Sequence, residues 1–137
     1  MKKQYSFCKF DMLILWVICS MLVLPTLVFA HGWKAPPAAA QITNPIQLNA
    51  ASIQKGQHIY GNRCASCHGE GGGGDGPLAE DLKPSPADLV KRLEGHSEGD
   101  FFWKISNGRG TMPSFRDQLT EKQIWMVINY LKTLMGQ

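Results

Sequence analysis

The segment Cys64-Ala65-Ser66-Cys67-His68 places two thiols three positions apart, with an imidazole directly after the second thiol. Thiols at this short fixed spacing reach the same edge of a porphyrin, where each adds across one vinyl group. The residue that follows then directs a ring nitrogen at the iron. The segment therefore predicts covalent attachment of c-type haem, with Cys64 and Cys67 as anchors and His68 as the proximal axial ligand.

Two other uses of paired cysteines fit this sequence less well. A thioredoxin-like dithiol opens a helix after a strand, in a βαβ pattern that is absent here. A zinc site needs a second pair of Cys or His ligands at suitable spacing. The sequence has four cysteines, and the other two, Cys8 and Cys19, lie in an apolar N-terminal segment. We therefore expect no structural disulfide.

Residues 1–30 have the pattern of a secretory signal. A lysine-rich opening precedes an apolar run over residues 12–24, and the segment ends on the small residue Ala30. Cleavage after Ala30 would remove Cys8 and Cys19. Lipoprotein processing at Cys19 is disfavoured by the large Ile18 before it.

An uncleaved membrane anchor is the main alternative to cleavage, because residues 12–30 approach the roughly 20 apolar residues that span a bilayer. Covalent haem is attached outside the cytoplasm in bacteria. We therefore expect a periplasmic protein, either free or anchored with its domain facing the periplasm. Contact with a membrane is expected only if the N-terminal segment is retained.

The charge of the expected mature chain gives no support to nucleic acid binding. The full sequence has 14 basic and 11 acidic residues. Removing residues 1–30 takes away three lysines and one aspartate, which leaves a net charge near +1. Two haem propionates would make the protein slightly negative, and a cation-rich surface for nucleic acid is not expected.

The mature chain is short enough for one small domain. Residues 31–48 are rich in proline and alanine and predict an extended arm, and residues 49–137 form the expected haem domain. The glycine-rich loop, Gly71–Gly76, follows the haem motif and not a strand. We therefore expect its backbone, which carries a side chain only at Asp75, to leave room beside the porphyrin, and we do not interpret it as a phosphate-binding loop.

Capping residues and apolar spacing predict helices and no strand, and hence an all-α fold. The expected caps or first residues are Asn49 or Ser52, Ser85 with Asp88, Ser97 with Asp100, and Thr120 with Gln123. We expect the second helix to reach about Leu93 and the third to stop at Gly108. The last helix has an apolar stripe formed by Ile124, Val127, Ile128, Leu131 and Leu134.

The sixth position of the iron has several candidate ligands. Met112 precedes Pro113, which favours an extended loop that brings a thioether to the distal face. Met126 and Met135 are better explained as packing or surface residues. Two histidines, His58 on the first helix and His96 in a glycine-flanked turn, are weaker alternatives. His31 would follow the cleavage site, where its amine and imidazole could chelate copper, but we interpret this as a chance product of cleavage.

Several segments together resemble the bacterial class I cytochromes c with one haem. They are Gly56, Tyr60, Cys64–Gly69, Gly74–Pro77, Phe102–Gly108, Met112–Phe115, Trp125 and Tyr130–Leu131. The resemblance covers about residues 52–134. It implies a small fold in which about four helices surround the haem, and in which the first and last helices cross at Gly56 against Tyr130–Leu131.

The same resemblance implies roles for individual residues. It implies His68 as proximal and Met112 as distal ligand, with the carbonyl of Pro77 accepting a hydrogen bond from the proximal imidazole. Trp103 or Arg109 would donate to a haem propionate, although Trp103 is equally well explained as a core residue.

His and Met ligation leaves no open iron position for a substrate, so we expect an electron carrier and not an enzyme. The expected partners are an electron donor and an electron acceptor, both redox proteins that dock briefly near the haem edge. Two alternatives stay open. One is a fixed haem subunit of a larger oxidoreductase, and the other is a haem enzyme or gas sensor whose distal methionine dissociates.

Overall fold

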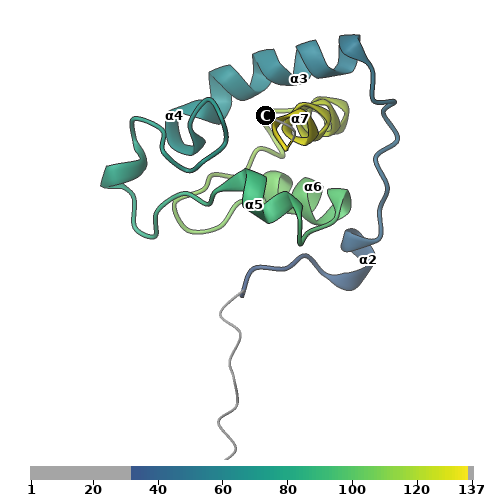
Figure 1. Cartoon of the computed structure of the whole chain (residues 1–137). Coiled ribbons are helices and arrows are strands. Elements are labelled where there is room, and N and C mark those ends of the chain that lie inside the picture. Colours follow the sequence, from purple (N-terminus) through teal and green to yellow (C-terminus); the bar gives the residue numbers. More distant parts are fainter. Residues whose placement is uncertain (1–31, 136–137) are drawn as a thin grey trace, which may run out of the picture. The chain divides into compact units, whose positions relative to one another are not determined.

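The computed structural model describes residues 32–135, and the predicted signal segment and His31 lie outside this range. Within it the chain is helical and has no strand, which confirms the all-α prediction (Figure 1). The elements are α2 (Pro37–Ala40), α3 (Ala50–Arg63), α4 (Ala65–His68), the short 3₁₀ helix η1 (Ala79–Asp81), α5 (Leu89–Leu93), α6 (Glu98–Asn107) and α7 (Glu121–Leu134). None of these helices is both long and apolar enough to cross a bilayer.

Most helix boundaries lie where the capping residues predict. Asn49 caps α3 and forms a capping box with Ser52, and Thr120 forms a second box with Gln123 at the start of α7. The Ser97 side chain accepts a hydrogen bond from the third amide of α6. This helix ends before Gly108, as predicted. These side chains satisfy amides that have no partner within the helix. The exception is α5, which begins at Leu89 after the Asp88 cap and not at Ser85.

The first long helix, α3, crosses α7 at Gly56, as the family resemblance implies (Figure 1). A β-carbon at Gly56 would overlap the Met126 carbonyl and lie 3.0 Å from the Tyr130 β-carbon. Glycine therefore permits the two helix backbones to approach closely. One turn further along α3, the Tyr60 ring packs against Tyr130 with 5.3 Å between centroids.

Gly56→Val should lower the free energy of unfolding by about 3 kcal/mol, at the upper end of the usual cost of overpacking. The added side chain meets backbone atoms of α7, which cannot rotate away. Gly61→Ala is the matched control, because no atom lies within 4 Å of a β-carbon there and alanine favours the helix. Chemical denaturation of the haem-loaded proteins measures both effects. Equal stabilities of the two variants would contradict the close-packing argument.

The core is centred on α7, which lies between α3 and α6 in Figure 1. All five residues of its predicted apolar stripe are buried. On the side that faces α6, Trp125 stacks on Phe102 with 4.3 Å between ring centroids. Each buried Ile, Val or Leu side chain of the stripe stabilises the fold by about 1.5–3 kcal/mol.

The segment before α3 differs from the expected extended arm. It contains one helical turn, α2, and it packs against α6 (Figure 1). Asn44 also joins it to α7, because the Asn44 amide donates to the Trp125 carbonyl and to the Asn129 side chain. These contacts join residues more than eighty positions apart, and no local periodicity in the sequence predicts them.

Candidate functional site

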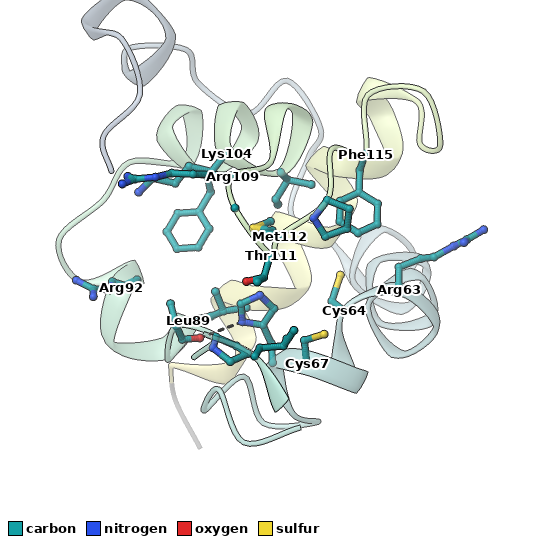
Figure 2. Close-up of a pocket in the computed structure, with 18 of the residues that line it drawn as sticks. Arg63, Cys64, Cys67, Leu89, Arg92, Lys104, Arg109, Thr111, Met112 and Phe115 are labelled. Carbon is teal, nitrogen blue, oxygen red and sulfur yellow. Dashed lines mark hydrogen bonds between the residues drawn. The ribbon is translucent and has the colours of Figure 1, made fainter. Parts of the chain in front are cut away.

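The two thiols of the haem motif line one cavity. Cys64 follows the last residue of α3, and its amide donates to the Tyr60 carbonyl. The chain then turns into α4, where the His68 amide donates to the Cys64 carbonyl. This change of direction brings Cys64 and Cys67 next to each other on one side of the cavity (Figure 2). The arrangement fits two attachment points on one edge of a porphyrin.

The cavity has a volume of about 540 Å³. Sites for cofactors and other small molecules usually measure about 300–1,000 Å³ and have mainly apolar walls. Its walls come from α3, α4, α5, α6, α7, the loops between them and the segment before α3. The apolar lining residues include Phe101, Ile105, Phe115, Val127 and Leu131. Size and polarity therefore fit a haem held in this cavity.

His68 is held in one orientation by a backbone carbonyl. Its Nδ1 lies 3.0 Å from the Ala87 oxygen, an interaction that Figure 2 marks with a dashed line. Because a carbonyl only accepts, Nδ1 must carry the proton, and Nε2 keeps the lone pair that binds iron. Burial lowers the pKa of His68 and so favours the neutral imidazole at neutral pH.

The implied role of Pro77 is wrong, because the carbonyl that contacts His68 belongs to Ala87. Pro77 is exposed and is not among the described residues that line the cavity. Backbone carbonyls have the same chemistry in every residue, so the sequence contains no side-chain signal for the one that accepts this bond.

The glycine-rich loop places Ala87 beside His68. The Gly74 amide donates to the His68 carbonyl at 2.8 Å, and the Leu89 amide donates to the Gly72 carbonyl at 2.7 Å. The loop thus ties the end of α4 to the start of α5. No residue of this loop is among the described residues that line the cavity, so the expectation of backbone room beside the porphyrin is wrong.

Among the methionines of residues 32–135, Met112 lines the cavity wall. It closes a tight turn with Arg109, in which each backbone amide donates to the other residue's carbonyl at 2.9 and 3.0 Å. Figure 2 shows Met112 across the cavity from Leu89. Leu89 lies two residues after Ala87, whose carbonyl contacts His68. A thioether here lies on the side of the cavity opposite to residues 87–89.

The other candidate distal ligands have different surroundings. Met126 is buried in α7, and His58 is exposed on α3. His96 pairs with Asp100, with 2.6 Å between its Nδ1 and the carboxylate. None of these three is among the described residues that line the cavity.

Trp103 also lies outside the described cavity lining, whereas Arg109 is part of it. Sequence reasoning missed Trp33 and Lys104, which line the cavity beside Arg109. The charged lining residues that the structure describes are Arg63, Arg92, Lys104 and Arg109, with no carboxylate among them. Trp33 was overlooked because it lies in the proline- and alanine-rich arm.

The surroundings of the thiols disfavour the other uses of a paired-cysteine motif. Burial, with a smaller effect of Cys67, raises the pKa of the Cys64 thiol to about 12. A redox-active dithiol requires the opposite shift, because the thiolate is the attacking species. Among residues 32–135, no group of three or more His, Cys, Asp or Glu side chains is placed to hold a metal ion.

Comparisons with known proteins agree with this geometry. Residues 51–131 match the family described as cytochrome C oxidase, cbb3-type, subunit III. The cbb3-type cytochrome c oxidase subunit CcoP of Azospirillum brasilense is 30% identical over 94 residues, which are 68% of this chain but only 32% of that protein. Cytochrome c6 of Cladophora glomerata is 32% identical over 85 residues, which are 61% of this chain and 90% of that protein.

A solved structure is also similar. A chain of the reducing HAO-like protein complex of Kuenenia stuttgartiensis superposes with a TM-score of 0.58 and 28% sequence identity. The match covers 66% of the present chain and 46% of the other. The helical fold around the cavity is thus shared with a known protein.

Proposed function

This chain belongs to the cbb3-type cytochrome c oxidase subunit III family, and on this ground we propose that it carries single electrons between redox proteins outside the cytoplasm. Membership makes it a class I cytochrome c. Its cofactor is c-type haem, and its general role is haem electron transfer. The attachment residues, the ligands, the location and the partners are parts of the proposal.

The proposed site uses Cys64 and Cys67 to attach one haem, with His68 and Met112 as its axial ligands. The haem supplies an iron that alternates between the ferric and ferrous states. The Ala87 carbonyl orients His68, and the apolar walls exclude water from most of the cavity. Both of these features help to set the reduction potential.

One observation carries this proposal, namely that the motif thiols, His68 and Met112 line a single apolar cavity. A methionine in the wall opposite residues 87–89 would fill the position that an oxygen or peroxide substrate needs. The arrangement therefore favours outer-sphere electron transfer over haem catalysis or gas sensing.

A fixed haem subunit of a larger complex is a second candidate. The similarities to an oxidase subunit and to a chain of a reducing HAO-like complex favour it. A diffusible carrier should elute from gel filtration as a small protein. A fixed subunit should instead elute from a gently solubilised extract together with a larger oxidoreductase.

A redox titration of the purified protein tests electron transfer. We expect one haem per chain, a single one-electron transition and no binding of carbon monoxide by the ferrous form at neutral pH. Intact mass also reports whether cleavage occurs after Ala30. Ready binding of carbon monoxide by the unmutated protein would contradict the carrier and favour the sensor or enzyme.

A further inference from the structure

The arm before α3 is fastened to α6 by specific contacts. The Ala35 amide donates to the Asp100 carboxylate at 2.5 Å, and the Ser97 hydroxyl donates to the Ala40 carbonyl at 2.6 Å. A β-carbon at Gly99 would overlap the Ala39 carbonyl and lie 2.6 Å from the Ile42 oxygen. The arm therefore lies directly on the backbone of α6.

Asp100 is the central residue of this attachment, and it is 4% exposed. Its carboxylate also pairs with Lys104 at 2.5 Å and with His96 at 2.6 Å. Burial alone would raise the pKa of Asp100, but the hydrogen bonds from Lys104 and from the Ala35 amide outweigh it and lower the pKa. The carboxylate is thus ionised at neutral pH and accepts strongly from the arm.

The fastened arm places Trp33 in the wall of the haem cavity. The Lys104 ammonium lies 5.6 Å and the Arg109 guanidinium 5.8 Å from the centroid of its ring. Both distances are within the range of a cation–π interaction. Trp33 is half-buried, although Gly32 before it and Lys34 after it are exposed.

Trp33 covers the end of the cavity away from the motif thiols. Figure 2 shows Lys104 and Arg109 on the side opposite to Cys64 and Cys67. A porphyrin attached to the thiols by its vinyl-bearing edge would extend its two carboxylates toward the cationic end. The arm at this end precedes the family match, which begins at residue 51.

We propose that the arm, residues 33–48, is a wall of the haem pocket in which Trp33 covers the carboxylate edge of the haem. Lys104 and Arg109 hold Trp33 in place, and Asp100 holds the arm. The wall limits the access of water and small reductants to the haem from this end. The proposal rests on the haem site described above.

Trp33→Ala should open this end of the pocket. We expect the rate of haem reduction by a small neutral hydroquinone to rise several-fold and the reduction potential to fall, because water then stabilises the ferric charge. Trp33→Phe keeps an aromatic cover and should stay close to the unmutated protein in both measurements. Trp103→Ala is the matched control, since Trp103 lies outside the described lining.

Gly99→Ala tests the wall without altering a lining residue. The new methyl group pushes the arm away from α6, so this variant should reproduce the faster reduction and lower potential of Trp33→Ala. Each variant is first stained for covalent haem. An unmutated protein without haem would overturn the proposed function and this inference together. A haem-loaded Trp33→Ala protein with unchanged rate and potential would overturn the role of the arm alone.

Discussion

Replacing Cys64 and Cys67 together with alanine should abolish covalent haem and most of the native packing. Without haem, buried core residues that line the cavity, among them Val127 and Leu131 of α7, face open space and lose the packing contacts that the porphyrin would supply. A chain this short has little other apolar contact to offset that loss. Haem staining of a denaturing gel and circular dichroism measure the two losses.

Ser66→Ala is the matched control for the double substitution. Ser66 lies between the two cysteines and is exposed, and its replacement keeps both thiols while removing only a weak contact of 3.9 Å between its hydroxyl and the Cys67 sulfur. It should retain haem on the gel and its native helix content. Haem that stays bound to the double variant on a denaturing gel would contradict attachment through Cys64 and Cys67.

The local features of the fold could be predicted from the sequence. The helix caps at Asn49, Ser97 and Thr120 can be predicted from residues no more than three positions away. A hydrogen bond confirms each of them. The apolar stripe of α7 follows from helical spacing. The crossing at Gly56 came from the resemblance to a family, because a glycine in a helix does not by itself identify the element that packs against it.

The surroundings of the haem motif could be predicted only in part. The motif and Met112 have distinctive side chains, and the structure brings them to one cavity. The partner of His68 is the Ala87 carbonyl, which has no side-chain signature and is brought close by the glycine-rich loop. Trp33 reaches the cavity through contacts between the arm and Asp100, 65 positions apart. Long-range backbone contacts of this kind leave no periodic pattern.

Substituting Met112 with alanine should turn the proposed six-coordinate carrier into a protein with an open iron position. Loss of the thioether should erase the weak far-red charge-transfer band of ferric His/Met haem and lower the reduction potential. Carbon monoxide should then bind the ferrous form, because alanine carries no group that can ligate the iron. Optical spectra with and without carbon monoxide and a redox titration measure these changes.

Met126→Ala separates a ligand from a methionine that only packs. Met126 is 8% exposed in α7 and is not among the described residues of the cavity wall. Its replacement should lower the free energy of unfolding by about 2–5 kcal/mol through the cavity it leaves, with the charge-transfer band intact. If Met112→Ala kept the band and stayed closed to carbon monoxide, Met112 would not be the distal ligand. Loss of the band in Met126→Ala instead would mean that α7 supplies the thioether.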